Sequence, residues 1–288
     1  MNLTDIGYVK RLMASHGITF QKKFGQNFLI NPIVPQRIAE ECGAKPEDAI
    51  LEIGPGIGTM TQYLCEMYAK VVAVEIDHAL IGVLRETLAD YDNVTVIEGD
   101  IMKTDLRALF AEHFAGMRVT VCANLPYYIT TPILMLLLES GIPLDNITVM
   151  IQKEVADRLS AVPGSAEYGA VTASVSYYAS VERLFVVSAG NFLPAPKVDS
   201  AVIRMTLYRD KPVKVKSERM LFRVIRAAFG QRRKTLLNAL SAGMGDFTKP
   251  QLTDAIRAVG LDEGIRGEKL SVAQFAALAD ALTEENTN

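Results

Sequence analysis

Short apolar runs alternate with helical stretches through the first half of the chain. The pattern predicts strands over residues 49–54, 71–75, 94–98, 119–123 and 147–151, and helices over 59–68, 79–90, 153–159 and 171–178. Two further apolar runs, 181–187 and 198–207, extend the predicted sheet to seven strands, while two prolines exclude regular structure from 191–196. Strands that alternate with crossover helices are typical of an α/β fold with a mostly parallel sheet.

A polar break over residues 210–212 separates this pattern from a remainder that is helical throughout. We therefore predict one α/β domain over residues 1–208 and a smaller all-α domain over residues 209–288. Within the second domain, apolar residues recur at helical spacing and form one face of a helix: Met220, Leu221, Val224, Ile225 and Ala228.

Composition narrows the class of protein. No run approaches the roughly 18 apolar residues of a membrane span, and the N-terminus lacks the pattern of a secretory signal. Three cysteines are too few and too scattered for a disulfide framework or a zinc site. We expect a cytosolic protein with no metal, no membrane association and no obligate protein partner. The net charge is −3, yet residues 204–234 hold eleven Lys/Arg and only two acidic residues, so one segment is strongly basic.

The first predicted strand leads into Gly54-Pro55-Gly56-Ile57-Gly58, a turn that opens a helix. Glycines at Gly54, Gly56 and Gly58 let the backbone approach a ligand closely, although such a turn is also common without one. Glu75 ends the second strand 21 positions after Gly54, where a carboxylate can accept both hydroxyls of a ribose. This pair fits NAD as well as S-adenosylmethionine.

Asp100 follows the third predicted strand. A carboxylate there can accept the exocyclic amino group of a cofactor's adenine, which favours S-adenosylmethionine. It can equally cap the helical turn that begins at Met102, and the two roles are compatible.

The sequence Asn124-Leu125-Pro126-Tyr127 ends the fourth predicted strand and is the most specific signal in the chain. The N6 nitrogen of adenine is a poor nucleophile because its lone pair is delocalised into the ring. Two acceptors, the Asn124 carboxamide and the Leu125 carbonyl fixed by Pro126, would favour a pyramidal nitrogen. Tyr127 would offer a ring on which an extruded base stacks. No general base is required, since the proton can leave to water once the nitrogen is cationic.

Four motifs resemble those of the bacterial small-subunit ribosomal RNA adenine dimethyltransferases: Phe24-Gly25-Gln26-Asn27-Phe28-Leu29, residues 52–58, residues 124–127 and Pro196-Lys197-Val198-Asp199-Ser200-Ala201-Val202. The resemblance extends from about Phe20 to Leu282. It implies a Rossmann-like S-adenosylmethionine-dependent methyltransferase domain followed by a helical RNA-binding domain. It further implies cofactor contacts through Asn27, Leu29, Gly54, Glu75, Asp100 and Asn124. The implied substrate is a pair of adjacent adenines in a hairpin near the 3′ end of 16S RNA, within a small-subunit precursor, each receiving two methyl groups.

The sequence leaves the physical roles of Asn27 and Phe192 open. The amides of Gln26 and Asn27 suit the carboxylate and ammonium of the cofactor's methionine part, although Asn27 can also serve as a helix cap. Phe192 precedes two prolines, and it would either stack on the second face of the target base or fill the core.

Basic residues form the predicted RNA contact. Charge runs are usually solvated faces, but here the excess is concentrated in an otherwise acidic chain, so we predict contacts to RNA phosphates. The candidates are Lys22, Lys23, Arg223, Arg226, Arg232, Arg233 and Lys234.

Three other functions compete with this interpretation. A 23S ribosomal RNA adenine methyltransferase of the macrolide-resistance type shares the first domain's motifs but tends to be strongly basic, whereas this chain has a pI near 5.7. A nicotinamide oxidoreductase would have a similar glycine turn, but the motif at residues 124–127 argues against this function. A ribosome-assembly factor that acts mainly by binding RNA remains compatible with the sequence.

Overall fold

The computed structural model describes residues 1–18 and 27–285. The chain divides into two compact units, one made of Met1–Ala156 and Val181–Leu207, the other of Asp157–Ser180 and Tyr208–Asn288. Each unit has its own arrangement of elements and is described by itself.

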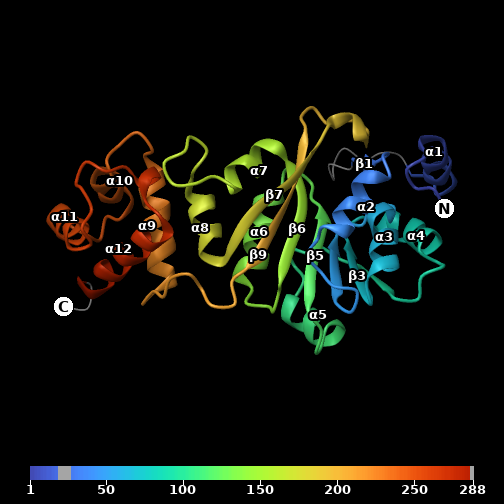
Figure 1. Cartoon of the computed structure of the whole chain (residues 1–288), viewed down its shortest axis with the longest axis horizontal. Helices are drawn as coiled ribbons and strands as arrows, with labels where there is room; N and C mark the ends of the chain where they lie inside the picture. Colours follow the sequence, from blue (N-terminus) through green and yellow to red (C-terminus); the bar gives the residue numbers. More distant parts are fainter. Residues whose placement is uncertain (19–26, 286–288) are drawn as a thin grey trace. The chain divides into compact units, whose positions relative to one another are not determined.

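The first unit is built on a sheet of seven strands in the order β4-β3-β2-β5-β6-β9-β7 (Figure 1). Pairing is parallel from β4 through β6, and β9 runs antiparallel to β6. The strands are β2 (Ala49–Ile53), β3 (Lys70–Glu75), β4 (Val94–Glu98), β5 (Val119–Asn124), β6 (Asn146–Gln152), β7 (Ala179–Val187) and β9 (Ser200–Leu207). The predicted seven-stranded, mostly parallel sheet is therefore confirmed.

The chain order places a switch point between β2 and β5. From β2 the chain steps outward to β3 and β4, then returns to β5 on the other side of β2. At such a point the crossover helices diverge and leave a crevice at the carboxyl ends of the strands, which is where open α/β sheets bind ligands. All five residues of β2 are buried, as expected for a central parallel strand covered on both faces.

Helices and short elements complete the first unit. Helix α3 packs against α2 and β3, and α4 packs against β3 and β4. The helices are α1 (Ile6–Ser15), α2 (Ile33–Glu40), α3 (Thr59–Met67), α4 (His78–Thr87), α5 (Leu106–His113), α6 (Thr130–Glu139) and α7 (Lys153–Leu159), which runs across the boundary into the second unit, with the 3-10 turn η2 (Ala189–Asn191).

A second, two-stranded sheet corrects one prediction. Strand β1 (Phe28–Leu29) pairs antiparallel with β8 (Phe192–Leu193), within the stretch predicted to have no regular structure. The prolines begin only at Pro194, so the backbone N–H groups of Phe192 and Leu193 remain available for pairing.

The second unit is a helical bundle centred on α9. Helix α9 packs against α8, α10 and α12, and its predicted apolar face contributes Leu221, Val224 and Ile225 to a buried core. The elements are α8 (Ala170–Tyr178), α9 (Glu218–Gly230), α10 (Leu236–Gly243), α11 (Lys249–Ala258), η3 (Gly267–Lys269) and α12 (Val272–Glu285).

The division of the chain differs from the predicted 1–208 and 209–288 in the segment 157–180 and by the single residue Tyr208, both of which belong to the second unit. Tyr168 and Tyr177 are buried in the same core as Leu221 and Phe275. The Tyr168 hydroxyl donates to the Leu270 carbonyl at 2.9 Å. This segment follows β6 directly, so sequence order suggests another crossover helix, whereas its aromatic side chains belong to the helical core.

No helix among residues 1–18 and 27–285 is both long enough and apolar enough to cross a membrane.

Candidate functional site

A cavity lies at the carboxyl edge of the sheet, where β2, β3 and β5 end. The space there that is unfilled by protein atoms is about 840 Å³, which includes open solvent at its mouth. Its walls come from the three strand ends, the start of α3 and the segment around β1. The lining residues are Asn27, Phe28, Leu29, Glu52, Gly54, Pro55, Gly56, Thr59, Met60, Glu75, Ile76, Leu80, Asn124, Leu125, Pro126, Tyr127 and Tyr128.

The glycine turn lines the cavity through Gly54 and Gly56, and it makes a packing contact through Gly58. Gly54 and Gly56 line the cavity with φ of 69° and 64°, a conformation that favours glycine. A Cβ at Gly54 would meet no atom within 4 Å, so its backbone faces open space. Gly58, with φ of 89°, is not among the lining residues. A Cβ there would lie 3.1 Å from Thr87 Oγ1, so this glycine serves the close approach of α3 to α4.

Glu75 lies at the end of β3 and fixes the turn. Its side chain is buried, and its Oε2 accepts from the Gly56 N–H at 3.1 Å while its Oε1 accepts from the Asp77 N–H at 2.8 Å. Burial raises the pKa of this carboxyl, and the two backbone N–H groups counteract the rise. Each carboxylate oxygen has further acceptor capacity, so Glu75 can hold the turn and accept ribose hydroxyls together.

Glu52 is a lining residue that the sequence reasoning missed. It lies inside β2 with 1% of its surface exposed, and its Oε2 has no hydrogen-bond partner among the described residues. Burial raises the pKa of this carboxyl to about 8, and the nearby charge of Glu75 adds to the rise. A buried acceptor without a partner is costly, so a cationic ligand group beside it would be favoured. The available signal was an acidic residue within an otherwise apolar strand.

Asn124 ends β5, and its side chain lies beside Asn27. The Asn124 Nδ2 donates to the Asn27 carbonyl at 3.3 Å, and both residues line the cavity. With its amide nitrogen so engaged, the carboxamide oxygen of Asn124 is the end left to accept a hydrogen bond from a ligand.

The backbone that follows Asn124 is fixed by three hydrogen bonds. The Leu125 N–H donates to the Met150 carbonyl at 3.1 Å, and the Pro126 carbonyl accepts from the Ile129 N–H and the Thr130 hydroxyl, each at 3.2 Å. The Leu125 carbonyl takes part in none of the three, and Leu125 lines the cavity. The turn is therefore rigid, and the Leu125 carbonyl is a second acceptor on it, next in sequence to Asn124.

Tyr127 lies on the same turn. Its side chain is half-buried, and its hydroxyl shares a hydrogen bond of 2.7 Å with the Ser200 hydroxyl on β9. Burial raises the pKa of Tyr127. The ring is thus held at the cavity by its far end, an interaction that the sequence did not predict.

Asp100 has the capping role that was one of its two interpretations. Its Oδ1 accepts from the Met102 N–H at 3.0 Å, and its Oδ2 lies 3.8 Å from Lys103 Nζ. Asp100 follows β4, two strands from β2, and is not among the lining residues. A contact from Asp100 to a cofactor's adenine stays a prediction.

Phe192 fills the core, which decides between its two interpretations. It is 2% exposed and packs in a buried cluster that includes Leu29, Ile38 and Met60. In this structure its ring has no open face for a base, because pairing of β8 with β1 turns it inward. Phe192 as a stacking residue is therefore corrected.

Three predicted residues, Lys22, Lys23 and Gln26, lie outside the described residues.

The basic segment of the second unit separates into two kinds of side chain. Arg223 forms a two-pronged ion pair with Asp246, one contact of which is 2.7 Å, and this pairing lowers the pKa of Asp246. Arg226, Arg233 and Lys234 are exposed, with no ion pair to any residue that the structure describes.

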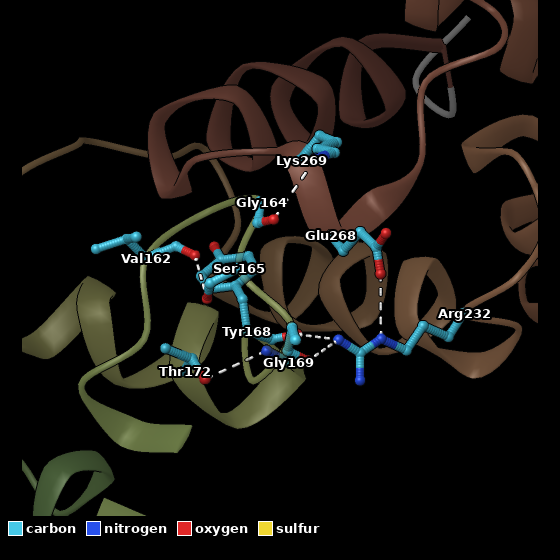
Figure 2. Close-up of polar contacts among 10 residues, drawn as sticks. Val162, Gly164, Ser165, Tyr168, Gly169, Thr172, Arg232, Glu268 and Lys269 are labelled. Carbon is cyan, nitrogen blue, oxygen red and sulfur yellow. Dashed lines mark hydrogen bonds and ion pairs between the residues drawn. The ribbon is translucent and has the colours of Figure 1, made fainter. Parts of the chain in front are cut away.

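Arg232 binds the protein's own chain (Figure 2). Its Nε donates to Glu268 at 3.1 Å, and its second terminal nitrogen donates to the carbonyls of Ala166 and Tyr168. Lys269 contacts the Gly164 carbonyl at 3.5 Å nearby. Arg232 therefore joins the 164–168 loop, the link between α9 and α10, and η3. This use of its donors argues against the predicted phosphate contact.

Comparison with known proteins gives a consistent answer. The family model described as ribosomal RNA adenine dimethylase matches residues 17–284. A ribosomal RNA small subunit methyltransferase A of Lachnoclostridium phytofermentans is 53% identical over 92% of each chain. A dimethyladenosine transferase from Plasmodium falciparum is similar in structure, with a TM-score of 0.76 and 26% identity over 90% of this chain and 97% of that one.

A 23S ribosomal RNA methyltransferase structure shares the fold, with a TM-score of 0.68 and 23% identity over 89% of this chain and all of the other. The glycine turn, Glu75 and the Asn124–Tyr127 turn converge on one cavity, and the family model spans that cavity and the helical unit alike. The chain belongs to the ribosomal RNA adenine dimethylase family, whose members are methyltransferases.

Proposed function

We propose that this protein transfers methyl groups from S-adenosylmethionine to the N6 amino groups of two adjacent adenines in 16S ribosomal RNA, within a small-subunit precursor in the cytoplasm. The observation that carries the proposal is the shared cavity, where an acceptor pair at Asn124 and Leu125 lies with the glycine turn and Glu75. S-adenosylmethionine supplies a methyl group activated by its sulfonium charge.

The lining residues suit that cofactor. Glu75 would accept the ribose hydroxyls while it holds the Gly56 N–H, and Asn27 and Leu29 line the same cavity. The buried Oε2 of Glu52, which has no partner among the described residues, suits a cationic donor such as the ammonium of the methionine part. A cation bound there would lower the raised pKa of this carboxyl and so favour its ionised form.

The target adenine would be held by three groups of this chain. Its two N6 hydrogens would be accepted by the Asn124 carboxamide oxygen and the Leu125 carbonyl, which favours a nucleophilic nitrogen. The ring of Tyr127 would stack on the extruded base. After transfer the N6 nitrogen carries a positive charge, and its proton leaves to water.

RNA affinity would come from the second unit, through the exposed Arg226, Arg233 and Lys234. Arg223 and Arg232 would instead hold the protein surface in shape, since both bind carboxylates of this chain.

The test is to incubate the protein with undermethylated small subunits and labelled S-adenosylmethionine, then map the modified nucleotides. We expect dimethylation of two adjacent adenines in a hairpin near the 3′ end of 16S RNA. Label found in 23S RNA of the large subunit would overturn the substrate. An Asn124→Ala variant that is inactive yet still supports subunit maturation would show that RNA binding is the more important role.

A further inference from the structure

Tyr128 lines the mouth of the same cavity, and its side chain is more exposed than any other aromatic side chain among the described residues. It is 64% exposed, whereas the neighbouring Tyr127 is half-buried and bonded to Ser200. One exposed aromatic residue is ordinary on a protein surface. A ring exposed at the rim of a site for an extruded base calls for a further explanation, because this is where substrate must pass.

The backbone that carries Tyr128 is rigid. It lies between Pro126 and Thr130, and the Pro126 carbonyl accepts from both the Ile129 N–H and the Thr130 hydroxyl. Helix α6 begins at Thr130. The side chain therefore projects from a fixed support, and ordering it on a ligand costs only the freedom of its own two torsions. Recognition surfaces favour tyrosine for this reason.

Extrusion of a base leaves its neighbour in the strand without a stacking partner. Aromatic side chains that accept unstacked bases are a general means of RNA recognition. Tyr127 and Tyr128 are consecutive, with Cα atoms about 3.8 Å apart, so a strand whose extruded base reaches Tyr127 carries the next nucleotide past Tyr128.

We propose that Tyr128 stacks on the nucleotide adjacent to the target adenine and thereby selects a strand with an accessible neighbouring purine. The inference rests on the proposed function, because it requires an RNA strand at this cavity. It assigns Tyr128 to RNA binding, separate from the Asn124 and Tyr127 contacts with the reacting base.

The experiment compares Tyr128→Ala, Tyr128→Phe and a surface control, Val186→Ala, which changes a residue 47% exposed on β7 that does not line the cavity. Substrates are small subunits reconstituted from transcribed 16S RNA, with both adenines intact or with either one replaced by uracil. Single-turnover rates are measured against subunit concentration at saturating S-adenosylmethionine, and cofactor affinity is measured by calorimetry.

Stacking on one base is worth a loss of about 5- to 150-fold in affinity when the ring is removed. Tyr128→Ala should raise the half-saturating subunit concentration by that order, with an unchanged plateau rate and cofactor affinity. Tyr128→Phe and Val186→Ala should match the wild type. Replacing the neighbouring adenine with uracil should weaken subunit binding by the wild type more than subunit binding by Tyr128→Ala. The reason is that only the wild type has a ring at position 128 that stacks on that base.

The proposal would be overturned if Tyr128→Ala lost the same factor of subunit affinity on adenine and on uracil substrates. It would also be overturned if Tyr128→Ala bound S-adenosylmethionine more weakly than the wild type. If the wild-type protein methylates neither adenine of the intact subunit, the proposed function itself fails, which is a different result.

Discussion

Polar side chains at the carboxyl edge of the sheet are fixed by the protein, whereas several on α9 and on the link from α9 to α10 are not. Glu75 and Glu52 are buried, and Glu75 and Asn124 are tied to backbone groups. Arg226 and Arg233 are exposed and make no ion pair with the described residues. A small ligand with fixed donors needs acceptors at fixed places, whereas a chain of phosphates needs mobile positive charge. Buried polar side chains with fixed partners therefore indicate a small-molecule site, whereas a local excess of exposed positive charge indicates a phosphate-bearing partner.

The largest effect should come from the exposed cations. Replacing Arg226, Arg233 and Lys234 together with Ala should flatten the salt dependence of subunit binding. Each phosphate contact contributes about 0.9 to the slope of log affinity against log salt, so three contacts are worth roughly 2–3 in slope and on the order of 100-fold or more in affinity near 0.1 M salt. Binding titrations at several salt concentrations measure this, with cofactor affinity as the control. An unchanged slope would make these side chains a solvated face.

At the sheet edge, Asn124→Ala should remove one acceptor from the reacting nitrogen. Preorganised groups of this kind contribute about 3 kcal/mol to the transition state, so the single-turnover rate should fall about a hundredfold. Tyr127→Phe is the milder comparison. It keeps the ring and loses the bond to Ser200, worth about 0.5–1.5 kcal/mol. A wild-type rate for Asn124→Ala would remove the acceptor role.

Glu75→Ala should weaken S-adenosylmethionine by about 1.5–3 kcal/mol, the range for hydrogen bonds to a charged group. The variant also frees the N–H groups of Gly56 and Asp77, so the glycine turn should loosen. Calorimetry of the folded variant measures the affinity, and Glu75→Gln tests whether an uncharged acceptor suffices. Undiminished affinity in Glu75→Ala would exclude the ribose contact.

Glu52 makes a prediction about pH. Its carboxyl stays protonated in the folded protein up to about pH 8, while its ordinary pKa is 4.5. Unfolding therefore releases a proton between these values, and the free energy of unfolding should fall with rising pH by up to about 1.4 kcal/mol per unit. Glu52→Gln should remove this decline and gain stability relative to the wild type toward pH 8. Urea unfolding at pH 5, 6, 7 and 8 is the measurement; parallel curves for the two proteins would contradict it.

Arg232→Ala should have the smallest effect on RNA and a visible one on folding. Loss of its bonds to Glu268 and to the 166–168 backbone should cost about 1 kcal/mol of stability, since the side chain is about half exposed. The salt slope of subunit binding should stay at the wild-type value. A salt slope reduced as in the triple variant would show that Arg232 contacts RNA phosphates, as the exposed cations are proposed to do.

The sheet and the residues at its carboxyl edge could be predicted from the sequence, because the carboxyl ends of neighbouring parallel strands lie at the same edge. Once β2, β3 and β5 were recognised, Gly54, Glu75 and Asn124 had to meet. Phe192 could not be placed in this way, because its burial depends on the pairing of β8 with β1, two strands of two residues each and distant in sequence.

The RNA-contacting residues could be predicted only in part from the local charge. The excess over residues 204–234 predicted one RNA surface, yet carboxylates from beyond that segment, Asp246 and Glu268, bind Arg223 and Arg232. The tertiary structure therefore determines which of the basic side chains are paired with carboxylates. Likewise Glu52 differs from an ordinary strand residue only through its surroundings, which bury it beside Glu75.

The second unit is built from two separate segments of the chain, which affects how the protein folds during synthesis. Its core requires Tyr168 and Tyr177 from the middle of the chain and Leu221 and Phe275 from the last third. As the chain leaves the ribosome, the sheet can close once β9 has emerged at Leu207, while α8 must wait for nearly 70 further residues with its apolar side chains uncovered. The nascent protein should therefore pass through a stage in which its methyltransferase sheet is complete and residues 157–180 are a target for chaperones or proteases.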